Sequence, residues 1–290
     1  MEMHNVVTQQ PVDELDKRPN IGRILLQTGK IRAKDAYPIL RMHLEQGLRF
    51  GDAAVKLGLV TKDDVRHALS QQFDYPCLPA DSVAVGQEVI AALRPHDPQV
   101  EALRALRNQI ALRWYRENKL MVITTPSAGQ GASRTAANLA VVFSQLGART
   151  LLVDANLRRP RQHKLFRLQS SLGLSDMLAG RVSTNTIQGV QQLTNLFILP
   201  AGTEPPNPLE LLGRPVLGDL INDISKQFDV VLIDTPPALE CADAQALSVR
   251  AGGALIVARR HHARIADIEE VKQQLAVAGA EAVGAVLTDF

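Results

Sequence analysis

The sequence predicts an α/β protein in which a doubly wound, mostly parallel sheet follows a small, mainly helical N-terminal domain. Before residue 73 the pattern is helical, with turns expected at Gly29, Gly47 and Gly58. Beyond residue 119, short apolar runs rich in β-branched residues alternate with helical stretches. Such runs are typical of strands buried on both faces of a parallel sheet. The runs cover 120–125, 150–155, 195–200, 229–234, 253–258 and 283–288.

Composition excludes several classes of protein. Lys and Arg number 32 against 30 Asp and Glu, which argues against binding to nucleic acid through bulk charge. No run approaches the ~20 apolar residues that span a bilayer, and the start has no apolar stretch of the signal-peptide type. Two cysteines cannot build a disulfide framework. We therefore expect a cytoplasmic protein that binds no nucleic acid.

The N-terminal part begins with a polar stretch, 1–19, which we expect to be a flexible tail. Within the following domain, 20–75, the sequence repeats itself: 20–43 and 49–72 are similar 24-residue units separated by five residues. The matching pairs include Gly22 with Gly51, Gly29 with Gly58 and Ile31 with Val60. This duplication predicts a pair of helical hairpins that serves at least as a docking module.

Prolines predict a linker between the two domains. Pro76, Pro79 and Pro95 fall within 76–97, which we interpret as irregular connecting chain. A helix over about 98–117 then opens the second domain, 98–290. Its apolar face is formed by Leu103, Leu106, Ile110 and Trp114.

A candidate phosphate site follows the first strand. The segment PSAGQGAS resembles the P-loop pattern G-x-x-x-x-G-K-[ST], in which backbone N–H groups and a helix N-terminus attract phosphate. Gly129, Gly131 and Ser133 fit the pattern, and Ser133 is a candidate magnesium ligand. Ala132, however, stands where the pattern has lysine. Arg134 lies about 200° further round the helix and is a poor substitute.

Two aspartates end later strands of the same sheet. Asp154 closes TLLVDA and Asp234 closes DVVLID, and ligands of open α/β sheets bind beyond the carboxyl ends of strands. Together with Ser133, the two carboxylates suit a magnesium ion held mostly through water. The alternative is that each aspartate only caps the helix that follows it.

Taken together, these motifs resemble the bacterial tyrosine kinases (BY-kinases) of capsule and exopolysaccharide systems over roughly 96–290. The resemblance rests on GQGAS, DANLRRP, DVVLIDTPP and LPAGTEPPNPLELL. It implies ATP and Mg²⁺ as cofactors, with Asp154 and Asp234 in catalysis and Ser133 beside them at the metal. The candidate nucleotide contacts are Gly129, Gly131, Ser133, Arg134 and Arg158. The family also assembles rings through a helical E-x-x-R-x-x-R stripe, which Glu101, Arg104 and Arg107 match.

The order of domains resembles the EpsG-type chain-length determinant tyrosine kinases. That resemblance implies a partner, a membrane co-polymerase that sets polysaccharide chain length, and a peripheral location at the inner membrane. The N-terminal repeat resembles the MshEN-type domain of secretion and pilus ATPases, which implies cyclic di-GMP binding. The second unit keeps Arg49, Gly51 and Gln72 of that pattern, whereas the first has Asn20 in place of the arginine and His43 in place of the glutamine.

Three departures from the kinase pattern bear on activity. Ala132 replaces the lysine, Asn156 replaces the second acid of D-x-D, and no tyrosine lies near the C-terminus. Four interpretations therefore remain open: an active autokinase, a pseudokinase scaffold, a cyclic di-GMP-responsive adaptor and a MinD/ParA-type positioning ATPase. The last is disfavoured, because those ATPases use the missing lysine.

Overall fold

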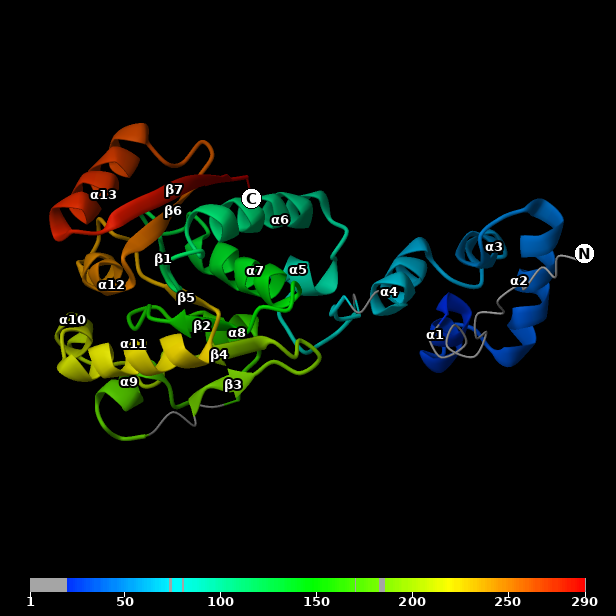
Figure 1. The fold of residues 1–290 in the computed structure, drawn as a ribbon, viewed down its shortest axis with the longest axis horizontal. Helices are drawn as coiled ribbons and strands as arrows, with labels where there is room; N and C mark the ends of the chain where they lie inside the picture. Colours follow the sequence, from blue (N-terminus) through cyan, green and yellow to red (C-terminus); the bar gives the residue numbers. More distant parts are fainter. Residues whose placement is uncertain (1–19, 73–74, 80, 170, 183–185, 290) are drawn as a thin grey trace, which may run out of the picture. The chain divides into compact units, whose positions relative to one another are not determined.

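A computed structural model describes residues 20–72, 75–79, 81–169, 171–182 and 186–289 (Figure 1). The expected tail, 1–19, lies outside the described residues. The chain divides into two compact units, Met1–Pro76 and Cys77–Phe290. In the part of the chain that the structure describes, every helix is too short or too polar to cross a bilayer.

In the first unit, both sequence repeats fold as a short helix, a glycine turn and a longer helix. Gly29 and Gly58 close the turns with φ of 69° each, a left-handed conformation that favours glycine. Asp35 and Asp64 each accept a backbone N–H three residues earlier, at 2.8 and 2.9 Å, and so cap the longer helices. The helices are α1 (Ile21–Gln27), α2 (Ala33–Gln46), α3 (Phe50–Lys56) and α4 (Lys62–Gln72).

Two glycines hold the halves of this unit together. A Cβ on Gly22 would lie 3.1 Å from the Phe50 ring, and one on Gly51 would lie 3.3 Å from Ile21 Cδ1. Because Phe50 and Gly51 are the repeat equivalents of Ile21 and Gly22, each half presses its apolar residue onto the glycine of the other. Gly51 also lies against Val65, whose Cγ1 would be 2.7 Å from the added Cβ. Gly51 therefore serves helix packing.

The second unit is built on a seven-stranded sheet of order β3-β4-β2-β5-β1-β6-β7, with β7 at one edge and β3 at the other (Figure 1). All neighbouring strands are parallel except β3 and β4, so the predicted mostly parallel sheet is confirmed. Only the short β3 has no counterpart among the predicted strands. The strands are β1 (Leu120–Thr124), β2 (Thr150–Asp154), β3 (Gln188–Gly189), β4 (Leu196–Leu199), β5 (Val230–Asp234), β6 (Gly253–Arg259) and β7 (Glu281–Thr288).

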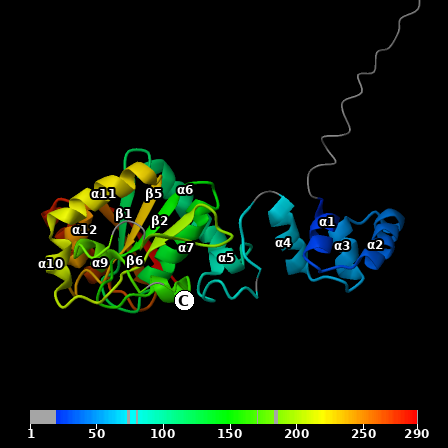
Figure 2. The same cartoon turned by 90° about the horizontal axis from the view of Figure 1, so that it is seen from below.

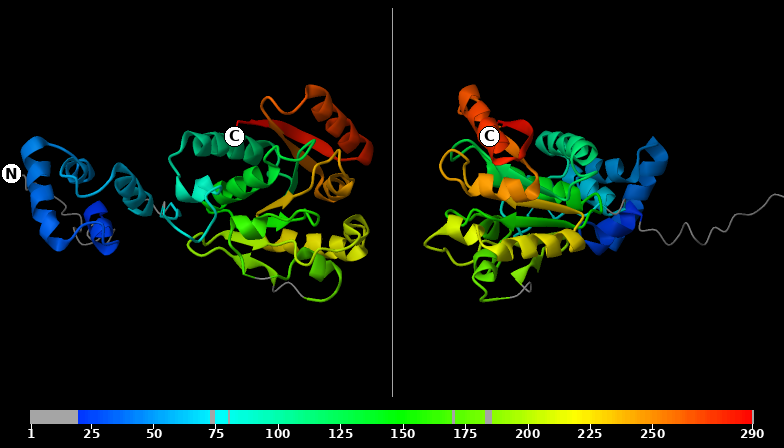
Figure 3. Two further views of the ribbon diagram at one scale, coloured as in Figure 1. Left: turned by 180° about the vertical axis from the view of Figure 1, so that it is seen from behind. Right: turned by 60° about the vertical axis from the view of Figure 1, so that its left-hand side comes forward.

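Alternate strand residues enter two apolar cores on opposite faces of the sheet. Met121 and Ile123 pack into one core, and Leu120 and Val122 pack into the other. Figure 2 shows α6 and α7 on one side of the strands and α10, α11 and α12 on the other, and Figure 3 shows α13 beside β7. The helices are α5 (Ile90–Leu93), α6 (Pro98–Arg113), α7 (Ala132–Ser144), α8 (Gln162–Leu165), α9 (Leu174–Leu178), α10 (Pro208–Leu212), α11 (Pro215–Gln227), α12 (Asp243–Ala251) and α13 (Ile265–Ala278).

Most of the predicted linker, 76–97, is part of the second unit. Leu78, Val85 and α5 are buried in the core beside α7. Asn138 of α7 accepts the N–H of Ala91 at 2.8 Å, and Gln145 donates to the carbonyl of Ala91 at 3.0 Å. The linker interpretation is thus wrong beyond Pro76, because prolines mark irregular backbone but do not reveal whether that backbone is buried.

The reciprocal glycine contacts make a testable prediction for Gly51. We expect Gly51→Ala to destabilise residues 20–72 by about 1–3 kcal/mol, because the added methyl must displace Val65 between two packed helices. Lys62→Ala, an exposed change in the same unit, should stay within about 0.5 kcal/mol. Amide hydrogen exchange on the full chain measures both. Equal protection of α1, α3 and α4 in the Gly51→Ala variant and the wild type would contradict the packing role.

Candidate nucleotide-binding site

A cleft of about 490 Å³ lies at the carboxyl ends of the central strands of the second unit. Three loops line it, within 125–134 after β1, 156–161 after β2 and 235–241 after β5. The cleft therefore lies where parallel α/β sheets bind their ligands. It unites the candidate loop and the ends of the strands that carry the two candidate aspartates.

The loop after β1 has the backbone of a phosphate-binding turn. Gly129 and Gly131 have φ of 80° and 88°, values that only glycine adopts without strain. Gly131 is the N-cap of α7, so the amides at the start of this 13-residue helix point toward the cleft. Ala132 lines the cleft with a side chain that is 6% exposed. The lysine of the P-loop pattern is thus replaced by a methyl group inside the cleft wall.

One loop amide is already occupied by the chain itself. Ala128 N donates to Glu240 Oε1 at 2.8 Å, which links the loop after β1 to the loop after β5. Sequence reasoning missed Glu240, because no motif marks a glutamate six residues beyond Asp234.

Asp154 and Asp234 lie side by side as register partners at the ends of β2 and β5. Both side chains are fully buried, and burial raises the pKa of each carboxyl group above its usual range. The charge of Asp234 raises the pKa of Asp154 further. Asp154 accepts the backbone N–H groups of Arg161 and Gln162 at 3.0 and 2.8 Å, although the N-cap residue of α8 is Arg161 and not Asp154.

Gln162 connects the three parts of the site. Its Nε2 donates to Asp234 Oδ2 at 2.7 Å and to the Ser133 carbonyl at 3.1 Å, and the residue is fully buried. Sequence reasoning missed this side chain, whose only signal is an uncharged polar residue shortly after DANLRRP. Its conformation depends on Asp234, which lies 72 residues further along the chain.

Two buried oxygens at the site, Asp234 Oδ1 and Gln162 Oε1, accept no hydrogen bond from the residues that the structure describes. A buried acceptor without a partner is costly, and carboxylate and hydroxyl oxygens are suitable Mg²⁺ ligands. Asp154, Asp234 and the Ser133 hydroxyl therefore fit a magnesium ion that keeps several waters. Among the described residues, no cluster of three or more His, Cys, Asp or Glu side chains could enclose a metal by itself.

The candidate arginines differ in their surroundings. Arg158 donates to both oxygens of the buried Asp243, at 3.0 and 3.2 Å. Arg134 lines the cleft, and its Nη2 lies 3.4 Å from Gln99 Oε1. Sequence reasoning did not foresee Asp243 as the partner of Arg158, since the two lie 85 residues apart.

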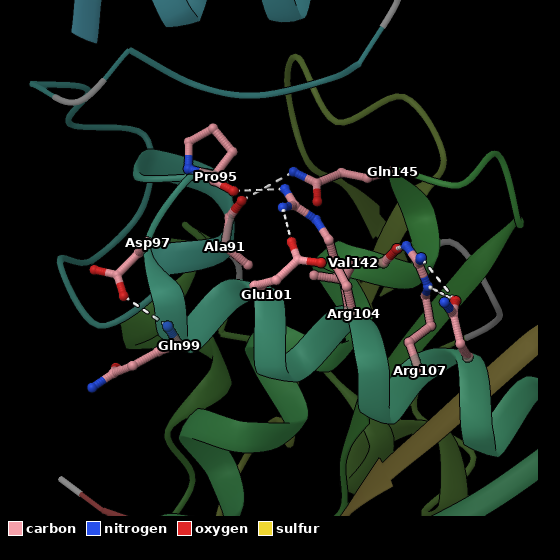
Figure 4. A network of polar contacts seen from close by, with 10 residues as sticks. Ala91, Pro95, Asp97, Gln99, Glu101, Arg104, Arg107, Val142 and Gln145 are labelled. Atoms are coloured by element: carbon pink, nitrogen blue, oxygen red, sulfur yellow. Dashed lines mark hydrogen bonds and ion pairs between the residues drawn. The ribbon is translucent and has the colours of Figure 1, made fainter. Parts of the chain in front are cut away.

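The charged stripe on α6 is largely engaged within the chain (Figure 4). Arg107 is only 7% exposed and donates to the Val142 carbonyl at 2.9 Å. Arg104 donates to the Pro95 carbonyl at 2.6 Å and to Glu101 at 2.9 Å. Of the three side chains predicted to face a neighbouring copy, only that of Glu101, at 73%, is well exposed. Both guanidinium groups therefore bond to main-chain carbonyls of the same chain, which the spacing of the motif does not reveal.

The remaining candidate residues lie in the first unit. Arg49, at the N-cap of α3, and Gln72, at the end of α4, are exposed. Gly51 is buried between helices. These three residues are therefore not part of the cleft lined by Gly129, Gly131 and Ser133.

Comparison with known proteins agrees with this geometry. A family model described as "AAA domain" matches residues 118–275. The tyrosine-protein kinase YwqD of Bacillus subtilis is 35% identical over 202 residues, covering 69% of this chain and 85% of YwqD. The kinase domain of the Escherichia coli tyrosine kinase ETK superposes with a TM-score of 0.66 at 32% identity, covering 74% of this chain and 81% of ETK's.

A longer relative also matches. EpsB of Ralstonia solanacearum is 38% identical over 202 residues, which is 69% of this chain and 27% of EpsB. The chain thus spans about a quarter of the length of this relative.

The unpartnered oxygen of Asp234 makes a testable prediction. Without metal, we expect Asp234→Asn to stabilise the second unit by roughly 1 kcal/mol, because it removes one of two adjacent buried charges. The side-chain oxygen of the new Asn can accept from Gln162 Nε2, as Asp234 Oδ2 does. Millimolar Mg²⁺ should then raise the unfolding temperature of the wild type more than that of the variant.

Asp223→Asn, which makes the same charge change on the exposed face of α11, is the matched control. It should leave both the stability and the Mg²⁺ response unchanged. A less stable Asp234→Asn protein that keeps the full Mg²⁺ response would exclude Asp234 as a metal ligand.

Proposed function

The chain belongs to the family of bacterial tyrosine-protein kinases, and on this premise we propose that it is a nucleotide-binding protein of exopolysaccharide biosynthesis with weak or no kinase activity. One observation carries the proposal. The cleft keeps the loop and the helix N-terminus of a nucleotide site, and the paired aspartates are buried at the ends of the strands next to it, but Ala132 occupies the lysine position.

Binding and catalysis make different demands on such a cleft. Backbone amides and a helix N-terminus bind phosphate without a lysine. Phosphoryl transfer depends on charges that stabilise the transition state, and loss of one such donor costs on the order of 10²–10³ in rate. Asn156 removes a further carboxylate of the kinase pattern. These losses favour a protein that binds nucleotide but transfers phosphate poorly.

The proposed ligands are ATP and Mg²⁺. Gly129, Gly131, Ser133, Arg134 and Arg158 are the proposed nucleotide contacts. Asp154 and Asp234 would hold Mg²⁺ with Ser133, and the ion would neutralise phosphate charge. An autokinase in which the two aspartates are catalytic is the rival proposal. Its phosphate acceptor would be Tyr37, Tyr75 or Tyr115 of this chain or a tyrosine of another protein.

We further propose a membrane partner, a co-polymerase that sets polysaccharide chain length, and a cytoplasmic location at the inner membrane through that partner. The support is the resemblance to EpsG-type kinases and the similarity to EpsB, YwqD and ETK.

A homo-oligomer through α6 also stays a prediction. It would have to use the exposed Glu101 carboxylate, because Arg104 and Arg107 have partners within the chain.

The Ala132→Lys variant tests how the missing lysine ammonium group affects nucleotide binding. We expect this variant to bind ATP·Mg²⁺ roughly 10- to 100-fold more tightly than the wild type, because a charged donor then faces the phosphates. Ala132→Met adds similar bulk without charge and should not tighten binding. Calorimetry measures the affinities, and a phosphotyrosine blot of purified wild type should be nearly blank. Robust phosphotyrosine on the wild type that is absent from Asp154→Ala would overturn the pseudokinase interpretation.

A second candidate function concerns the first unit, which we propose as a weak cyclic di-GMP receptor. Its repeats pack through reciprocal contacts, so Asn20 and Arg49 occupy equivalent helix N-caps. A cyclic dinucleotide has two equivalent halves, and two equivalent positions could offer one contact set to each. Asn20 is uncharged and its oxygen already accepts the N–H of Arg23 at 2.9 Å, so its half should bind more weakly.

We expect the full chain to bind cyclic di-GMP weakly, Arg49→Ala to lose the binding, and Asn20→Arg to strengthen it. Lys62→Ala, an exposed change in the same unit, is the control. NMR amide shifts of residues 20–72 measure the response. If the amide shifts do not change at high micromolar cyclic di-GMP, or if Arg49→Ala leaves the changes intact, the receptor proposal is excluded and a protein-docking role is left for this unit.

A further inference from the structure

Two departures from the kinase pattern change the charge of the cleft in opposite directions. Ala132 removes a positive charge and Asn156 removes a negative one. Both residues line the same cleft. The net charge that these two positions contribute is therefore the same as in the kinase pattern, although position 132 in the loop after β1 no longer carries a cation. Four arginines and two glutamates line the cleft, so its charged rim is net basic.

Three of these arginines come from the loop after β2, and their environments differ. Arg158 is bound by both oxygens of the buried Asp243, at 3.0 and 3.2 Å. Arg161 is bound by both oxygens of Glu88, also at 3.0 and 3.2 Å. Arg159 lines the cleft, and its guanidinium has no ion pair or hydrogen bond with the residues that the structure describes. Its charge is thus the uncompensated one in this loop.

The backbone of this loop is held from both ends. Asp154 accepts the N–H groups of Asn156, Arg161 and Gln162, at 3.3, 3.0 and 2.8 Å. Asn156 Oδ1 in turn accepts the N–H of Arg159 at 3.0 Å. Arg159 therefore starts from a fixed backbone position, which lowers the entropy that its side chain loses when it engages a ligand.

The amide at position 156 matters for charge as well as for geometry. An aspartate there could accept the same N–H, but it would add a negative charge to the loop that carries Arg159. Asn156 supplies the acceptor without the negative charge. Asparagine in place of aspartate at position 156 thus keeps the turn and leaves the Arg159 guanidinium available to an anion.

We propose that Arg159 supplies the phosphate-binding cation that position 132 lacks. The proposal rests on nucleotide binding by the cleft and adds the residue that recognises the ligand. Its ligand is a nucleoside di- or triphosphate, because a guanidinium fork binds two phosphate oxygens at once. In this arrangement the cation enters from the loop after β2 and not from the start of α7.

The test compares ADP and ATP binding, each with Mg²⁺, by calorimetry on the full chain. We expect Arg159→Gln to weaken both by roughly 10- to 100-fold, the range for a hydrogen bond to a charged group. Arg116→Gln, an exposed arginine after α6 and outside the cleft, makes the same charge change and should bind as the wild type does. Thermal unfolding checks that both variants are folded.

A double-variant cycle with Ala132→Lys then tests the substitution itself. If Arg159 binds the phosphates in place of the missing lysine, Arg159→Gln should weaken nucleotide binding much less in the Ala132→Lys background than in the wild type. An equal loss in both backgrounds would overturn the proposal, as would equal losses in Arg159→Gln and Arg116→Gln.

The outcomes separate this inference from the proposed function. If the wild type binds ADP and ATP and the Arg159→Gln variant binds them with the same affinity, Arg159 is excluded as a phosphate contact and the proposal of nucleotide binding stands. A wild type that binds neither nucleotide overturns the proposed function and this inference with it.

Discussion

Two carboxylates buried side by side at the ends of β2 and β5 are the constraint around which the second unit is arranged. Asp154 and Asp234 are register partners with no exposure to solvent. Such a pair is unfavourable unless protons, hydrogen-bond donors or a cation compensate it. Backbone amides satisfy Asp154 and thereby shape the loop after β2, whereas one oxygen of Asp234 has no hydrogen-bond partner in the described part of the chain. The pair thus organises one wall of the cleft and leaves a position that suits a cation.

The groups around this pair underlie our proposal that the cleft binds nucleotide but transfers phosphate poorly. The glycines and the start of α7 supply dipoles that attract any phosphate, and they do not depend on residue 132. Phosphoryl transfer needs charge placed where it develops in the transition state. Ala132 and Asn156 change the charged groups and leave the backbone intact, so our proposal assigns them a larger effect on catalysis than on binding.

The first unit shows a similar separation between packing and recognition. Gly22 and Gly51 each receive an apolar residue of the opposite repeat, and this reciprocal contact depends on small size alone. The polar positions at the N-caps are free of that constraint. Asn20 uses its side chain to cap α1, and Arg49 leaves its own exposed. The two halves can therefore diverge in charge while they remain alike in fold.

The sequence by itself determined the regular elements, because their signals are local. The apolar runs from 120 to 288 became parallel strands, although the run at 283–288 lies in the edge strand β7, which is mostly not buried. The glycines at 129 and 131 became the left-handed positions of a loop, and both aspartates came to lie at strand ends. The repeat at 20–72 became two similar helical hairpins for the same reason. Only the tertiary structure decided which polar groups meet. Arg107 bonds across 35 residues, Gln162 across 72 and Arg158 across 85, and α5 is held by side chains of α7. Periodicity encodes which face of an element is buried, but a polar side chain finds its partner through the order of strands in the sheet. No short stretch of sequence contains that order.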